Sequence, residues 1–415
     1  MLQNPMRVAV LAAVVCVFTP LPADATDGGT TDTPRHPDCR NDPAPLSVHC
    51  GHTPTPVIDG EGRLRVAWVQ RDRVLVAASD DWGQTFDAPV AVNPEPEPID
   101  HNGENRPKLA LGPAGELYVS YTRRLERRFS GDIRFSRSLD GGTHFSSPVT
   151  VNDNREPISH RFDALGVDGE GAVFLAWLDA RDAAAADRVG HRYPGSALYY
   201  ARSTDGGRSF SANGKLADHS CQCCRIALDM DPDGLPVLIW RHVFGTSTRD
   251  HALLAFRDHG MPGELRRASE DGWEIDACPH HGPGLSIHDD GVYHMVWFTN
   301  ASEQRRGPYY AHSMDAGRAF SDPLPVGRRD RSASHPDVLS LGARVAIAWT
   351  EVDGDDTILK VMQSADGGRR WGAPFEQARM PGPADHPLWL ESEGEALLSW
   401  HGPAAGYQLF KVSAP

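Results

Sequence analysis

The chain of 415 residues repeats one short unit seven times, and this repeat limits its fold more than any other feature. Each unit is a short apolar segment, a Gly-centred turn and a second apolar segment that ends in an aromatic residue. The first unit runs from Pro54 to Trp68, with its ends 14 residues apart. The other units are residues 107–121, 163–177, 226–240, 283–297, 336–349 and 387–400. Short strands joined by tight turns at a regular interval predict an all-β protein.

A second motif, Ser-x-Asp-x-Gly-x-x-aromatic, lies between these units. Its copies are Ser79–Phe86, Ser138–Phe145, Ser203–Phe210, Ser313–Phe320 and Ser364–Trp371, with a degenerate copy at Phe256–Gly260. The Asp carboxylate accepts backbone N–H bonds across such a turn, the Gly tolerates a positive φ, and the aromatic ring covers the sheet. These motifs are similar to Asp boxes, also called BNR repeats. Over most of residues 50–415 the chain resembles the sialidase-like β-propeller superfamily, and this resemblance implies an architecture while leaving the reaction open.

We therefore expect one β-propeller over residues 46–415. Six units supply four strands each, but the seventh supplies only three, near residues 387–391, 396–400 and 407–412. The missing outer strand is expected from Pro45–Cys50, which would close the ring and remove an open edge. Strand counting favours seven blades over the six blades that are usual in sialidases.

The N-terminus has the pattern of a secretory signal peptide at residues 1–25. Arg7 precedes the apolar run Val8–Phe18, which is too short to span a bilayer, and Ala23–Ala25 has the pattern of a cleavage site. Residues 26–45 are expected to be a flexible lead-in. These features predict an exported protein, periplasmic or extracellular, without a transmembrane segment. The net charge of −15 makes nucleic acid a poor partner.

Histidines gather at the start of every unit, where the first strand of each blade would enter the central channel. The candidates are His52, His101, His160, His280, His281, His335 and His386. Imidazoles that converge on one axis predict a metal or ligand site, and copper and zinc are the ions that suit them. The alternative is that His before a strand is a turn or capping choice, since channel mouths are polar in any case.

Six cysteines follow the signal peptide, and four of them lie near the same ends of the units. Cys221, Cys223, Cys224 and Cys278 either add thiolate ligands for zinc or Cu(I), or form disulfides across neighbouring blades. Cys39 and Cys50 are a further candidate pair.

The sialidase resemblance implies three arginines that clamp a carboxylate, a Tyr–Glu nucleophile pair and an acid/base carboxylate. Arg106, Arg161 and Arg225 occupy equivalent strand heads, and Glu104 and Tyr407 are the accompanying candidates. The arginines lie in consecutive units, however, and the Tyr has no recognisable context. We also expect the ends of the second strands, such as Trp177–Asp182, on the opposite rim, and an extended loop at Ala183–Ala186.

Three function classes follow from these observations. The first is an exported propeller with a His/Cys-rich ligand or metal site at the channel mouth, which as an enzyme would be redox or hydrolytic. The second is an exo-α-sialidase or related glycoside hydrolase, and the third is a non-catalytic binding or assembly module. A small molecule, a glycan or a metal ion is the expected ligand, and the oligomeric state is left open.

Overall fold

A computed structural model describes residues 35–413 of the chain. The predicted signal peptide and the first part of the lead-in lie outside these residues, so they stay predictions. The described part is nearly all β, with 48% strand and 5% helix, arranged as a seven-bladed β-propeller. The expected fold class and the choice of seven blades over six are confirmed.

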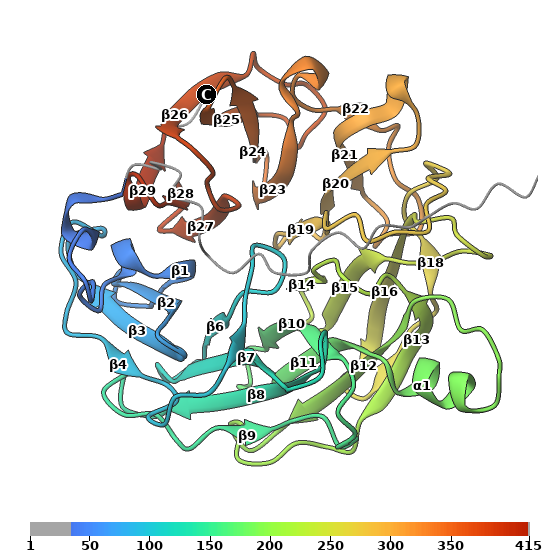
Figure 1. Cartoon of the computed structure of the whole chain (residues 1–415). Coiled ribbons are helices and arrows are strands. Elements are labelled where there is room, and N and C mark those ends of the chain that lie inside the picture. The colour runs from blue at the N-terminus through green and yellow to red at the C-terminus, as the bar shows by residue number, and fades with distance from the viewer. Residues whose placement is uncertain (1–34, 414–415) are drawn as a thin grey trace, which may run out of the picture. The chain divides into compact units, whose positions relative to one another are not determined.

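Each blade is an antiparallel sheet whose strands follow chain order from the channel outward (Figure 1). Blade 1 consists of β1 (His52–Ile58), β2 (Leu64–Gln70), β3 (Arg73–Ser79) and β4 (Val90–Ala91), and blade 2 of β5 (Ile99–Asp100), β6 (Lys108–Leu111), β7 (Leu117–Arg124), β8 (Gly131–Ser138) and β9 (Val149–Thr150). Blade 3 consists of β10 (His160–Val167), β11 (Val173–Asp179), β12 (Ser196–Ser203) and β13 (Gly214–Ser220). Blade 4 consists of β14 (Ala227–Met230), β15 (Pro236–Arg241), β16 (His251–Asp258), β17 (Met261–Pro262) and β18 (Arg266–Arg267).

The last three blades complete the ring. Their strands are β19 (Gly284–Ile287), β20 (Tyr293–Asn300), β21 (Arg306–Ser313) and β22 (Leu324–Pro325); β23 (Ser334–Leu341), β24 (Arg344–Asp353), β25 (Asp356–Ser364) and β26 (Phe375–Pro381); and β27 (Leu388–Ser392), β28 (Glu395–Gly402) and β29 (Gly406–Val412). The helical elements are α1 (Arg181–Arg188) and the 3-10 turns η1 (Pro37–Cys39), η2 (Val48–Cys50), η3 (Glu303–Arg305) and η4 (Arg329–Arg331). No helix within the described residues is long and apolar enough to cross a membrane.

The core is built from the repeating sequence unit. The aromatic residues that close the second strands are buried between neighbouring sheets, and six of them are tryptophans at 1% exposure or less: Trp68, Trp177, Trp240, Trp297, Trp349 and Trp400. The Ser/Asp turns join the third strand of a blade to its fourth and repeat one bonding pattern. In the first of them, the backbone N–H of Gly83 donates to Ser79 Oγ at 2.8 Å and that of Thr85 to Asp81 Oδ1 at 2.8 Å.

The seventh blade differs from the expectation. It has three strands, and Pro45–Cys50 is not its outer strand, because Val48–Cys50 forms the 3-10 turn η2 beside β29 and β2. Blades 7 and 1 are joined there without a shared strand. The backbone N–H of Tyr407 donates to the His49 side chain at Nδ1, 3.2 Å away, and apolar side chains of both blades pack together. The expected Cys39–Cys50 disulfide is present and holds this segment.

Antiparallel pairing also corrects the expectation for the second strands. His160 at the start of β10 pairs with Asp179 at the end of β11, so first-strand heads and second-strand ends share one face of the propeller. This face is called the mouth face below. The segment Ala183–Ala186 lies within α1 on this face, because an alanine-rich run favours helix over an extended loop.

Candidate functional site

The inner strand of blade 2 is split, and residues 101–107 between its two parts reach toward the centre of the ring on the mouth face (Figure 1). Asn102 Oδ1 accepts the backbone N–H of Glu104 at 2.9 Å, which tightens this segment. Gly103 lies so close to His386 that an added Cβ would be 2.4 Å from the imidazole Nε2, so a larger residue does not fit. The segment therefore carries Glu104 to the channel axis.

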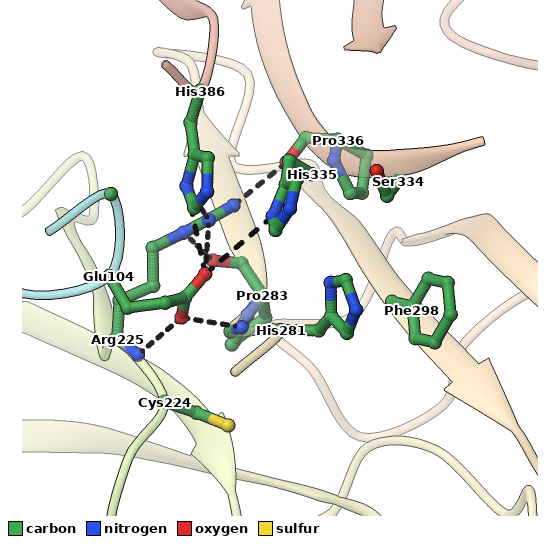
Figure 2. A network of polar contacts seen from close by, with 12 residues as sticks. Glu104, Cys224, Arg225, His281, Pro283, Phe298, Ser334, His335, Pro336 and His386 are labelled. Carbon is green, nitrogen blue, oxygen red and sulfur yellow. Dashed lines mark hydrogen bonds and ion pairs between the residues drawn. The ribbon is translucent and has the colours of Figure 1, made fainter. Parts of the chain in front are cut away.

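Glu104 is the centre of a polar network that joins five blades (Figure 2). Its side chain is 3% exposed. Oε2 accepts the backbone N–H groups of Arg225 at 2.8 Å and Gly282 at 2.7 Å, and Oε1 accepts from Arg225 Nη1 at 3.2 Å. The Nδ1 atoms of His335 and His386 lie 3.9 Å and 3.7 Å from the same Oε1. These residues stand at the heads of the inner strands of blades 4, 5, 6 and 7, so one carboxylate bonds blade 2 to blades 4 and 5 and contacts histidines of blades 6 and 7.

The guanidinium of Arg225 is held on every side. Nε donates to the carbonyl of Pro283 at 2.9 Å, and Nη2 donates to the carbonyl of Pro336 at 2.8 Å. Nη1, which already bonds Glu104, also lies 3.3 Å from His386 Nδ1 and can donate to it. The His335 and His386 rings stack with centroids 3.7 Å apart. The network is therefore rigid, and no N–H edge of Arg225 is left for a substrate carboxylate.

The charges of this network are set by burial and by Arg225. Burial opposes ionisation of Glu104, but the charge of Arg225 and the neighbouring His335 hold the pKa of its carboxyl below the ordinary value. Burial lowers the pKa of His335 to about 4. Burial, together with His335 and Arg225, holds the pKa of His386 well below its ordinary range. Both imidazoles are thus neutral near pH 7 and lie beside an ionised carboxylate.

Neutral imidazoles and a carboxylate are also metal ligands, and ligand atoms of Glu104, His335 and His386 lie within 4.8 Å of one another. Arg225 already places a permanent cation on the same carboxylate oxygen and within 3.3 Å of the same imidazole nitrogen. A metal ion at this point would have to displace or approach that guanidinium, which is unfavourable for two cations. Metal binding by these histidines stays a prediction, and the geometry explains them as buried neutral groups packed against the Glu104–Arg225 ion pair.

The other candidate histidines are divided among several places. His52 and His101 stack on each other with centroids 5.2 Å apart. His160 is fully buried, with Nδ1 2.9 Å from Asp179 Oδ2, which marks it as a structural residue. The tertiary structure therefore does not bring all of the expected imidazoles together at one point.

His280 and His281 point to different surroundings although they are adjacent. The His281 ring stacks on Phe298 at 3.9 Å and lies 4.7 Å from the His335 ring, so it extends the central network. Burial, with the charge of nearby cations, lowers the pKa of His281 to about 2. His280 instead lines a cleft on the mouth face.

The arginines of the sialidase hypothesis are occupied by the protein itself. Arg106 Nη2 donates to Asp385 Oδ1 at 2.7 Å, and Arg161 Nε donates to Asp100 Oδ2 at 2.5 Å. With Arg225 bound as described above, the three guanidinium groups do not form a common clamp. These bonds favour inter-blade roles for the three residues.

Tyr407 lies away from these arginines, at the junction of blades 7 and 1. It is 3% exposed and packs edge-on against Phe86, with centroids 5.9 Å apart. Burial raises the pKa of its hydroxyl well above the ordinary value, so it is not an activated nucleophile. Glu104 does not pair with it, because Glu104 belongs to the network at the axis.

The four remaining cysteines carry free thiols and form a group of their own. Cys221, Cys223 and Cys224 are buried, while Cys278 is exposed. The expected disulfides among them are not formed, and the histidines of the axis do not mix with them in either of the metal-ligand groups found within residues 35–413.

A cleft that sequence reasoning missed opens on the mouth face beside blade 2. It has a volume of about 910 Å³ and is lined by residues that include Arg124, Arg128, Phe129, Arg161 and His280. Phe129, in the turn between β7 and β8, is 64% exposed and has φ of 61°. The Cζ atoms of Arg128 and Arg161 lie 4.6 Å and 5.9 Å from the centre of its ring. The run of arginines at 123–128 is a signal in the sequence that pointed here.

Comparison with known proteins gives the fold alone. No family model and no curated protein matches the chain. A solved structure of a PL25 ulvan lyase bound to -[GlcA(1-4)Rha3S]- is similar, with 12% identity and a TM-score of 0.56, covering 87% of this chain and 93% of the lyase. The polysaccharide lyase Uly1 is similar at 9% identity and a TM-score of 0.54, over 89% of this chain and 92% of its own. A Hadza microbial sialidase has 16% identity and a TM-score of 0.49, over 85% and 73%. The propeller expected from the sialidase resemblance is confirmed as a fold.

Proposed function

We propose that this chain is an exported β-propeller that binds an acidic carbohydrate in the cleft of the mouth face. The observation that carries this proposal is Phe129, an aromatic ring that is 64% exposed at the cleft and has two guanidinium groups within 6 Å of its centre. Exposed aromatic rings provide flat apolar faces on which sugar rings stack, and guanidinium groups bind carboxylate and sulfate through paired N–H bonds. The ligand site thus lies beside the His-rich axis and not at its centre.

The charge balance of the cleft supports an anionic ligand. Four arginines line it against three carboxylates, although the whole chain carries a net charge of −15. Glu97 and Asp100 are already paired with arginines. Among residues 35–413, no carboxylate lies within 4.0 Å of the guanidinium groups of Arg124 and Arg128. These two cations are the ones we expect to contact the ligand.

The similar lyases are consistent with this proposal, but they do not carry it, because their identity to this chain is low. The ligand bound to one of them contains a uronic acid and a sulfated sugar, whose carboxylate and sulfate are anionic groups that guanidinium recognises. Export is part of the proposal and rests on the sequence of residues 1–25. Mass spectrometry of the exported protein should give a mature chain that begins near Thr26.

The test is a binding measurement on the mature protein with matched acidic and neutral polysaccharides, by calorimetry or affinity electrophoresis. Wild type is expected to bind polymers that carry uronic acid or sulfate and to bind more weakly as salt is raised. Phe129→Ala, and separately Arg124→Ala with Arg128→Ala, should each weaken binding by about tenfold, since about 1.4 kcal/mol corresponds to that factor. Separate activity assays on the same proteins measure polysaccharide chain cleavage and the hydrolysis of a fluorogenic sialoside.

Two variants away from the cleft serve as controls. Phe375→Ala removes an aromatic ring that is 40% exposed in β26, and Arg208→Ala removes an exposed arginine in a Ser/Asp turn. Both should bind as wild type does. Equal binding of neutral and acidic polymers would refute an acidic ligand, and full binding by Phe129→Ala would show that the cleft is not the ligand site.

A further inference from the structure

Four cysteines that carbohydrate binding does not use lie together on the mouth face. Cys221, Cys223 and Cys224 follow β13 in the connection between blades 3 and 4, and they are 1%, 4% and 2% exposed. Cys278 comes from the connection between blades 4 and 5. Segments 54 residues apart in the sequence therefore bring four thiols to one place.

The spacing of the sulfur atoms is that of metal ligands. Sγ of Cys221 lies 3.9 Å from Sγ of Cys223 and 3.6 Å from Sγ of Cys224. A disulfide requires sulfurs about 2 Å apart. Four sulfurs at about 2.3 Å from a tetrahedral zinc ion lie about 3.8 Å from one another. Two of the three distances between the buried thiols thus already match the edge length of a tetrathiolate zinc site, and the third is no longer than 4.8 Å.

The fourth corner is available from Cys278. Its thiol lies beside that of Cys223 but stands outside the group of three thiols whose sulfurs lie within 4.8 Å of one another, so it would move inward to become the fourth ligand. Cys278 is the exposed member of the group, so it is placed where an ion would enter. The backbone is anchored on the other side, where Cys221 donates its N–H to the carbonyl of Arg241 at 2.8 Å.

Two buried arginines supply the matching charge. Arg241 is 1% and Arg249 is 7% exposed, and both act electrostatically on Cys221. Within residues 35–413, Arg241 Nε and Arg249 Nη1 have no hydrogen-bond partner. Four thiolates around Zn²⁺ carry a net charge of −2, which two guanidinium groups neutralise, whereas the same thiolates around Cu⁺ would leave an excess of negative charge.

We propose that Cys221, Cys223, Cys224 and Cys278 bind one zinc ion and that Cys278 is the ligand through which the ion enters. Buried cysteines also occur as small apolar residues. That explanation accounts for three of these thiols, but not for the exposed fourth thiol beside Cys223 or for the buried Nε of Arg241 and Nη1 of Arg249, which have no hydrogen-bond partner within residues 35–413. The site would fix Arg225, the residue after Cys224, and so hold the main partner of Glu104 in place (Figure 2).

The test measures metal and thiols in the full mature chain, purified without chelator or reductant. Elemental mass spectrometry is expected to find about one zinc per chain. After exchange for Co²⁺, the protein should show the intense visible absorption of tetrahedral cobalt and a thiolate-to-metal charge-transfer band. Cys278→Ser should lower zinc affinity by more than about tenfold, because even the loss of a group that only contacts a metal ligand can lower affinity by about tenfold. Chelator should lower the melting temperature of wild type.

The control is the double variant Cys39→Ser with Cys50→Ser, which removes the disulfide and should keep the zinc. Cys221→Ser should lose the zinc, and its melting temperature should no longer respond to chelator. If Cys221→Ser does not fold, the exposed Cys278→Ser variant and the cobalt spectrum still decide the question. Three results would each overturn the proposal. They are a metal-free protein in which the four cysteines form two disulfides, four free thiols that bind no zinc after reconstitution, and preferential retention of copper. None of these results depends on carbohydrate binding.

Discussion

Removal of the Glu104 carboxylate should weaken the whole ring, because this group is the contact point of five blades. It accepts two backbone N–H bonds of 2.8 Å and 2.7 Å and one guanidinium bond of 3.2 Å while only 3% exposed. Glu104→Ala leaves the charge of Arg225 and two N–H groups without a partner. Loss of one member of a buried ion pair costs about 3–5 kcal/mol of the free energy of unfolding.

The Glu104→Gln variant removes the negative charge of the side chain while nearly keeping its shape. The amide oxygen can still accept the backbone N–H groups of Arg225 and Gly282, whereas the amide NH2 takes the place of Oε1 and cannot accept from the Arg225 guanidinium. We expect a cost of about 2 kcal/mol, the value of a hydrogen bond to a charged group. Glu156→Ala is the matched control, since its pair with Arg188 is exposed and contributes less than about 1 kcal/mol.

The assay is guanidinium chloride unfolding followed by tryptophan fluorescence, which reports on the buried tryptophans of the blades. The expected order of stability is wild type with Glu156→Ala, then Glu104→Gln, then Glu104→Ala. If Glu104→Ala is no less stable than Glu156→Ala, then the carboxylate does not join the blades and the interpretation of the network is wrong.

Two further predictions concern the core and the histidines. Trp177 Nε1 donates to Asp179 at 2.8 Å, whereas Trp240 Nε1 has no partner within the described residues. In thermal or chemical unfolding, Trp177→Phe should therefore lower the free energy of unfolding by about 1–3 kcal/mol more than Trp240→Phe does. Equal losses in the two variants would refute this role of the bond. Burial lowers the pKa values of His101 and His335 to about 4, so below pH 6.5 the unfolded chain binds protons that the folded chain does not. The free energy of unfolding should therefore fall as the pH falls from 6.5 to about 4, and each of the two histidines should contribute up to about 1.4 kcal/mol per pH unit. A melting temperature that stays constant over this range would contradict the prediction.

The repeat by itself determined the architecture. Apolar segments ending in an aromatic residue dictate antiparallel strands, and a unit that cannot bury its own faces must stack on neighbours, so seven units predict seven blades. The Ser/Asp turns are local and are recognisable because their side-chain bonds join residues two to four positions apart. Strand bounds follow from the same short-range pattern, and β27, β28 and β29 lie within two residues of the ranges expected near 387–391, 396–400 and 407–412.

Only the tertiary structure decided which strand heads meet. The alignment of units placed histidines, arginines and cysteines at one end of the blades, but it could not tell that residues 101–107 depart from the ladder and carry Glu104 across the axis. That contact joins residues up to 282 positions apart and depends on side-chain direction within a few ångströms. For the same reason, the histidines and the thiols became separate groups, and the seventh blade is closed by the η2 turn and not by a strand. Local periodicity specifies the blades, whereas the chemistry at their mouth depends on long-range contacts that no repeat encodes.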